Sequence, residues 1–242
     1  MQQATLLRHL VRQDFTDRYA GSALGTAWVL ITPLMQILVF TLVFGKLIGP
    51  RIPGSESIYA YGLYLVSGIL PWMSFANTVG RTTGVFLDKG PILRKMPLRL
   101  STVAFHITVV ETITLAAVLL LFTAVRVVLF GVPPATALMA PLLMVYQQLV
   151  AFTLGLIAAI VTVFVRDAKE AVGVGLFLWF WLTPIVYLFD DVPWPLQVIQ
   201  PFNPAYWFIE PWHRIMVYGQ VPDFGWLALT GGGTVLLLLL VL

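Results

Sequence analysis

Residues 136–165 read TALMAPLLMVYQQLVAFTLGLIAAIVTVFV, a stretch with no Asp, Glu, Lys or Arg. An apolar helix of about 20 residues crosses a hydrocarbon core about 30 Å thick. This run is long enough to cross at a tilt or to begin outside the bilayer. It therefore predicts a transmembrane helix, and the rest of the chain is best considered in a membrane setting.

The composition supports a membrane protein. Of the 242 residues, 59% are hydrophobic and 10% are charged, and the mean hydropathy is +0.91. A soluble domain has about 45–50% apolar and about 25% charged residues. These values exclude an ordinary cytosolic enzyme, a disordered protein and a nucleic-acid-binding domain. The chain has no cysteine, which excludes disulfides, thiol catalysis and Cys-ligated metals.

Six apolar segments are candidate membrane spans, and they predict an all-α polytopic membrane protein. The fifth is interrupted by Pro184. The six segments are residues 24–45, 58–80, 102–125, 136–165, 171–189 and 224–242.

Basic residues predict the orientation, because they gather on the cytoplasmic side of membrane proteins. With six spans, four of the basic residues fall on one side: Lys46, Arg51, Arg126 and Arg214. The other ten basic residues fall on the opposite side: Arg8, Arg12, Arg18, Arg81, Lys89, Arg94, Lys95, Arg99, Arg166 and Lys169. The sequence thus predicts a multi-pass protein of the cytoplasmic (inner) membrane with both termini in the cytoplasm.

Residues 5–19 have the pattern of an amphipathic helix, because Leu7, Leu10, Val11 and Phe15 fall on one face. Such a helix lies in the membrane interface; the alternative is a cytosolic cap packed on the bundle. Near the other end of the chain, residues 190–218 combine aromatic residues with several prolines. We expect short re-entrant or interfacial helices there, broken at the prolines.

Several sequence motifs of enzymes are missing. The chain has no G-x-x-x-x-G-K-[ST] loop, no G-x-S-x-G elbow and no H-E-x-x-H pair. These absences predict a chain with no catalytic residue, bound cofactor or metal of its own. Glu111 lies near the middle of the third span, where an ionisable group is costly. Three roles stay open for Glu111: pairing with a basic group, binding a polar substrate, or a neutral hydrogen-bonded state.

Five local patterns occur in order along the six-span chain: RYAGSALGTAW at 18–28, GILPW at 68–72, LRKMPL at 93–98, VRD at 165–167 and PIVY at 184–187. This set resembles the ABC-2 type transport permeases, most closely the branch that exports polysaccharides such as O-antigen, capsule and teichoic acid. The resemblance covers nearly the whole chain. It implies one transmembrane domain over residues 1–242 and a role in moving a lipid-linked polysaccharide across the cytoplasmic membrane.

The resemblance also implies partners. Two copies of this chain would form the conduit, and two copies of a separate nucleotide-binding ATPase subunit would bind ATP and Mg and hydrolyse the ATP. The family docks its ATPase through a coupling region, which maps here to residues 87–98, with a second contact between spans four and five. Residues 190–218 would be the outer gate helices. The docking candidates are Leu87, Asp88, Lys89, Arg94, Lys95, Arg166 and Asp167; the alternative is that these charges only fix topology.

Aromatic rings are candidates for lining a glycan channel, because the flat C–H faces of sugars stack on them. The alternative is that these rings pack the bundle or anchor it in the membrane. A diphosphate linker would favour Arg12, Arg18 and Arg81 near the inner entrance, where the alternative is again topology and anchoring. The channel-lining candidates are Tyr59, Trp72, Glu111, Trp179, Trp181 and Tyr187.

Three rival functions remain at this stage. An ABC-2 exporter of a lipo-oligosaccharide, lipid or drug would have a similar six-span plan. A membrane-embedded transferase would need convergent acids, histidines or a metal motif, which the sequence does not offer. A passive channel or scaffold would need no ATPase partner.

Overall fold

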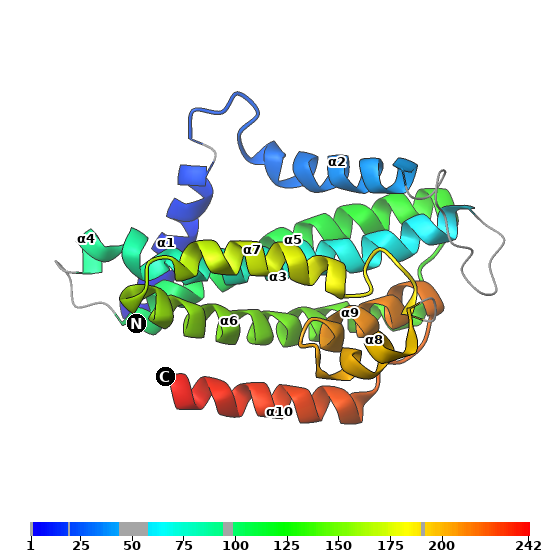
Figure 1. The fold of residues 1–242 in the computed structure, drawn as a ribbon. Helices are drawn as coiled ribbons and strands as arrows, with labels where there is room; N and C mark the ends of the chain where they lie inside the picture. The colour runs from blue at the N-terminus through cyan, green and yellow to red at the C-terminus, as the bar shows by residue number, and fades with distance from the viewer. Residues whose placement is uncertain (1, 19, 44–57, 94–98, 190–191) are drawn as a thin grey trace.

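The computed structural model describes residues 2–18, 20–43, 58–93, 99–189 and 192–242. All the regular elements in these ranges are helices (Figure 1), so the prediction of an all-α chain is confirmed. The elements are α1 (Gln2–Arg18), η1 (Gly25–Ala27), α2 (Trp28–Val43), α3 (Ile58–Asp88), α4 (Gly90–Leu93), α5 (Leu100–Phe130), η3 (Ala135–Met139), α6 (Ala140–Phe164), α7 (Ala168–Leu182), α8 (Trp194–Ile199), η5 (Gln200–Phe202), α9 (Tyr206–His213), η6 (Arg214–Tyr218) and α10 (Phe224–Val241).

Three helical stretches within the described ranges are long and apolar enough to cross a membrane: Leu100–Val128, Ala135–Phe164 and Phe224–Val241. They match the third, fourth and sixth predicted spans. The other three predicted spans overlap α2, α3 and α7. Their crossing of the membrane stays a prediction.

Two helix boundaries differ most from those expected from the sequence. The α3 helix continues past residue 80 to Asp88, so Arg81 lies on a helix rather than in a loop. The α7 helix ends at Leu182, earlier than the predicted residue 189. Proline disfavours the α conformation in the residue before it, and Thr183, which precedes Pro184, is extended with φ −101° and ψ 137°.

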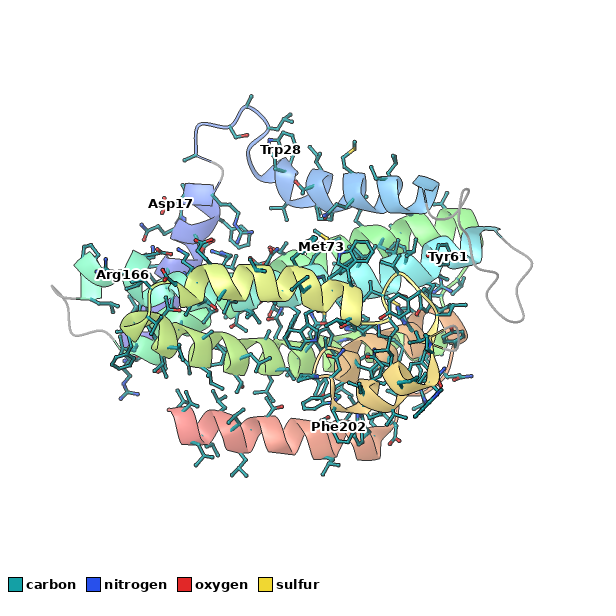
Figure 2. The ribbon with its side chains drawn as sticks, in the orientation of Figure 1. Asp17, Trp28, Tyr61, Met73, Arg166 and Phe202 are labelled. Atoms are coloured by element: carbon teal, nitrogen blue, oxygen red, sulfur yellow. The ribbon has the colours of Figure 1, made fainter. Side chains whose placement is uncertain are left out.

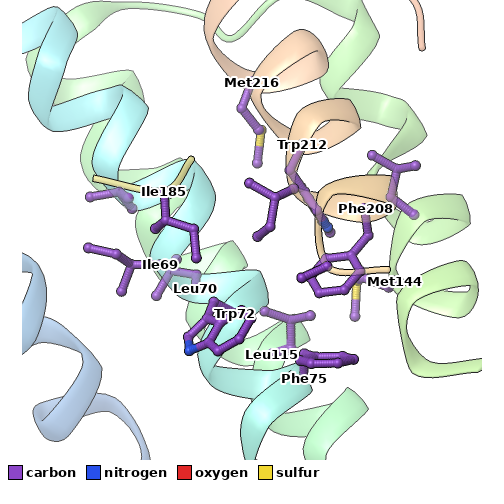
Figure 3. Packing of buried hydrophobic residues seen from close by; sticks show 14 of the residues in the cluster. Ile69, Leu70, Trp72, Phe75, Leu115, Met144, Ile185, Phe208, Trp212 and Met216 are labelled. Carbon is purple, nitrogen blue, oxygen red and sulfur yellow. The ribbon is translucent and has the colours of Figure 1, made fainter. Parts of the chain in front are cut away.

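The α3 helix is the centre of the bundle and packs against α2, α5, α6, α7 and α9. Its buried side chains, including Ile69, Leu70, Trp72 and Phe75, point towards neighbours on other helices (Figure 3). At Gly155 of α6 the two helices approach closely, since an added Cβ there would lie 2.9 Å from Cβ of Thr82. The absence of a side chain at Gly155 therefore sets the spacing between α3 and α6.

The two ends of the bundle differ. The long helices run along a common direction, and α1 crosses one end of them (Figure 1). Both chain termini lie at this end, which we call the α1 end. The short helices α8 and α9 cover part of the opposite end, the α9 end. α1 packs against α5 with Leu10 buried; its position relative to a membrane interface stays a prediction.

Candidate functional site

Glu111 lies on α5 and is only 1% exposed. Arg18 Nη2, from α1, and Arg81 Nη1, from α3, each donate to the same oxygen, Oε1, at 2.7 Å. The amide of Asn77 contacts the other oxygen, Oε2, at 3.5 Å. Of the three roles left open by the sequence, the structure shows the first: Glu111 pairs with basic groups.

A second carboxylate joins the same two arginines. Arg81 Nη2 donates to Asp14 Oδ2, and Arg18 Nη2 lies 3.6 Å from Asp14 Oδ1 one helical turn away. Two cations and two anions thus bring together one helix at the end of the bundle and two helices of its interior.

His106 completes the group. Its ring is 2% exposed, its Nδ1 contacts the carbonyl of Val103, and its Nε2 lies 3.4 Å from Asp14 Oδ2. Both neighbours are hydrogen-bond acceptors, so each ring nitrogen of His106 faces an oxygen. We call Asp14, Arg18, Arg81, His106 and Glu111 the charge cluster.

The cluster affects the ionisation of Asp14, which lies on α1 outside the predicted spans. Burial raises the pKa of its carboxyl. The hydrogen bond with His106 and the charges of Arg81 and Arg18 act in the opposite direction and prevail, so the pKa lies below its ordinary value of 3.8. Asp14 is therefore ionised at neutral pH and holds both arginines as a charged partner.

A cavity of about 530 Å³ opens beside the cluster. Arg18, Arg81 and His106 line one part of it, and Asp88, Lys89 and Lys169 line another. Removing charges from water costs several kcal/mol per ion unless they are paired. Ionisable groups within membrane helices therefore mark functional sites by default, and this cavity is the candidate site.

The structure places the three predicted entrance residues differently. Arg18 and Arg81 lie in the charge cluster and line the cavity. Arg12 is exposed on α1 and is not among the lining residues. The substrate role of all three stays a prediction.

The described parts of the two predicted docking segments lie together at the α1 end, where Arg166 is labelled in Figure 2. Lys169 Nζ, at the start of α7, lies 3.3 Å from Asp88 Oδ1 at the end of α3. Leu87 and Asp88 are exposed and Lys89 is half-buried. Arg166 and Asp167 are exposed between α6 and α7, whereas Arg94 and Lys95 lie outside the described residues.

The tryptophans predicted to line a channel have unlike surroundings within one chain. Trp72 is 6% exposed and packs edge-to-face against Trp179 with ring centroids 6.2 Å apart. Trp179 Nε1 donates to Asn203 Oδ1 at 2.6 Å. Trp181 is 47% exposed.

The two predicted tyrosines also differ. Tyr187 lies after α7, and its hydroxyl donates to the carbonyl of Trp181 at 3.2 Å. The side chain of Tyr59 lies outside the described residues. Whether any of these aromatic rings lines a channel stays a prediction.

Sequence reasoning missed Asp14 and His106 as members of the site. The only local signal was the spacing of Asp14 and Arg18, four residues apart on one helix. A lone histidine in an apolar helix gives no such signal. In the parts of the chain that the structure describes, no group of three or more His, Asp or Glu is arranged to hold a metal ion.

The apolar helices and the buried ion pairs define a class, a multi-pass helical membrane protein with a charged internal site. Residues 5–216 match the family described as ABC-2 type transporter. The chain belongs to this family, and it is a permease of the ABC exporter type.

Named relatives agree with the family. The chain is similar to O-antigen export system permease protein RfbA of Klebsiella pneumoniae, with 24% identity over 88% of this chain and 81% of the relative. It is also similar to the protein of the same name from Myxococcus xanthus, with 25% identity over 90% of this chain and 82% of that protein.

Proposed function

We propose that this chain is the membrane-spanning subunit of an ABC exporter that carries a lipid-linked polysaccharide across the cytoplasmic membrane. A separate nucleotide-binding subunit, holding ATP and Mg, would drive it. The observation that carries this proposal is the charge cluster with its cavity at the α1 end. The printed names of its relatives, which are permeases of O-antigen export systems, support the same substrate class.

The chemistry of the cavity suits a phosphate-containing linker. Guanidinium groups form strong, often bidentate hydrogen bonds with phosphate as well as with carboxylate. Arg18 and Arg81 are 26% and 32% exposed, so both guanidinium groups are partly accessible from the cavity. A diphosphate arriving there would compete with Glu111 and Asp14 for the same donors. Arg12, exposed on α1, would raise the local concentration of anions.

The ATPase subunit would dock at the α1 end. Exposed charges at Asp88, Arg166 and Asp167 offer complementary contacts to a charged partner. The Asp88–Lys169 pair links the two candidate docking segments and also lines the cavity. A shift of the docking segments would therefore reach the walls of the candidate site directly.

A second copy of the chain would complete the conduit. None of the residues of α7 is buried within one chain, and Phe177 and Leu178 on it are more than half exposed. An added Cβ at Gly173 or Gly175 would meet nothing within 4 Å. Small residues allow close helix approach in membranes, so this face suits a homodimer, with lipid as the alternative neighbour.

Deletion of the gene for this chain in its source cell tests the proposal. We expect the surface polysaccharide to disappear and its lipid-linked form to accumulate inside, and the intact gene to restore export. An unchanged surface polysaccharide, together with loss of a surface lipo-oligosaccharide, lipid or drug efflux, would favour the alternative exporter. The matched control is a cell complemented with the same chain lacking residues 224–242.

A further inference from the structure

A second cavity, of about 390 Å³, lies at the α9 end. It shares no lining residue with the cavity beside the charge cluster. Its walls come from α3, from the segment after α7, and from α9 and η6. Its volume falls within the range of pockets that hold small ligands, about 300–1,000 Å³.

The floor of this cavity is aromatic and fixed. Tyr64 is 2% exposed and stacks on the ring of His213, with centroids 3.9 Å apart. Its hydroxyl shares one hydrogen between the carbonyls of Pro184 and Tyr187, which lie 3.1 and 2.9 Å away. These bonds lock the ring in place, so the floor is formed before any ligand arrives.

The rim carries more accessible groups. Tyr218 is 42% exposed, and Gln220 is exposed beside it. Gly219 between them adopts φ +62°, a left-handed turn that favours glycine. The Gln220 N–H donates to the carbonyl of Arg214 at 3.0 Å, which fixes Gln220 at the rim. On the other wall Phe189 and Tyr206 stack with centroids 5.5 Å apart.

The polar groups of the cavity are balanced in charge. Glu210 and Arg214 form an ion pair one helical turn apart. Burial lowers the pKa of His213 to about 3, so its ring is uncharged at neutral pH. The cavity therefore offers donors, acceptors and ring faces without a net charge, which suits a neutral ligand rich in hydroxyl groups.

We propose that this cavity binds sugar residues of the exported glycan. Hydroxyl groups would bond to Glu210, Arg214 and Gln220, and a C–H face would pack on the ring of Tyr218. This inference rests on the proposed function and assigns the two ends of the molecule to two parts of one substrate. The α1 end takes the charged linker and the α9 end takes the neutral sugars.

Calorimetric titration of the purified chain in detergent tests the site. The probe is the set of lipid-free oligosaccharides released by mild acid from the surface polysaccharide of the source cell. We expect binding by the unaltered chain, and a Kd raised about fivefold or more by Tyr218→Ala or Gln220→Ala, since each removes a ring face or a hydrogen bond. Phe202→Ala is the matched control, because Phe202 is 79% exposed at the same end and does not line the cavity.

The outcomes separate the two proposals. Equal affinity of the unaltered chain and both rim variants, or no binding by the unaltered chain at millimolar probe, overturns the sugar site. If cells lacking the chain lose their surface polysaccharide and regain it on complementation, the proposed function stands in either case. Retention of the polysaccharide in those cells overturns the proposed function itself.

Discussion

Glu111 is the residue on which the charge cluster depends, because two guanidinium groups share one of its oxygens. Glu111→Gln keeps the shape and removes the charge. We expect the free energy of unfolding to fall by about 2–4 kcal/mol, since the change leaves two partly buried cations without this partner. Unfolding of the purified chain in detergent, followed by tryptophan fluorescence, measures the loss.

The control is Glu170→Gln, an exposed carboxylate in the first turn of α7. A surface charge of this kind contributes about 0–1 kcal/mol. Equal stability of the two variants would show that the ion pairs with Glu111 do not hold α1 on the bundle.

His213 makes the stability of the α9 end depend on pH. Burial lowers its pKa from 6.5 to about 3, so between these pH values the unfolded chain binds a proton that the folded chain does not. The stability that depends on an uncharged His213 is fully present above pH 6.5, and it is lost as the pH falls towards 3. At pH 5 the loss is about 2 kcal/mol relative to pH 7.5.

Unfolding measured at pH 7.5 and 5 for the unaltered chain and for His213→Gln checks this. We expect a smaller pH effect in the variant. His9→Gln, at an exposed position on α1, should keep the full effect; an equal pH effect in all three proteins would refute the role of His213.

At the scale of elements, the contact between α3 and α6 depends on Gly155. An added methyl there would lie 2.9 Å from Cβ of Thr82 and 3.3 Å from the Cα of Val79. We expect Gly155→Ala to lower the free energy of unfolding by about 1–3 kcal/mol, because the two helices must move apart. Gly80→Ala is the control, since its nearest new neighbour is Leu176 at 3.7 Å, an ordinary contact. The midpoints of thermal unfolding of the two variants test this prediction. Equal midpoints would mean that the spacing between α3 and α6 tolerates the extra methyl.

The helices were predictable from the sequence to the extent that local patterns determine them. Long apolar runs predicted α5, α6 and α10, and Pro184 pointed to an interruption near the end of α7. The extension of α3 to Asp88 was missed because Arg81, two threonines and Gly84 interrupt the apolar run at residues 81–84. This part of the helix is held by contacts from other helices, such as the ion pairs of Arg81, which no local pattern contains.

The site was predictable only in part. Glu111 stood out as a charge in an apolar run. Arg18 and Arg81 were predicted as basic residues near the inner entrance. Their meeting was not predictable, because Arg18 and Glu111 are 93 residues apart. Tertiary packing alone brings the two arginines and Glu111 into contact with one another and with Asp14 and His106.

At the scale of the whole molecule, the predicted coupling region of residues 87–98 should bind the ATPase subunit. Charge reversal in Arg94→Glu/Lys95→Glu should lower the amount of co-purified ATPase several-fold, because it replaces complementary charges by repulsive ones. Lys46→Glu/Arg51→Glu, a double reversal in the predicted outer loop, is the matched control. Quantification of both subunits after gentle purification from membranes gives the ratio, and undiminished ATPase in the first variant would remove these residues from docking.

Transport itself tests the central claim most directly. The complex of this chain with its ATPase subunit, reconstituted in proteoliposomes, should move radiolabelled lipid-linked polysaccharide to the opposite leaflet only when ATP and Mg are supplied. Protection of the labelled glycan from an added glycosidase measures this movement. ATP-dependent movement is the predicted result. An active ATPase that moves no lipid-linked glycan, but moves a lipid or a drug in the same vesicles, would contradict the account.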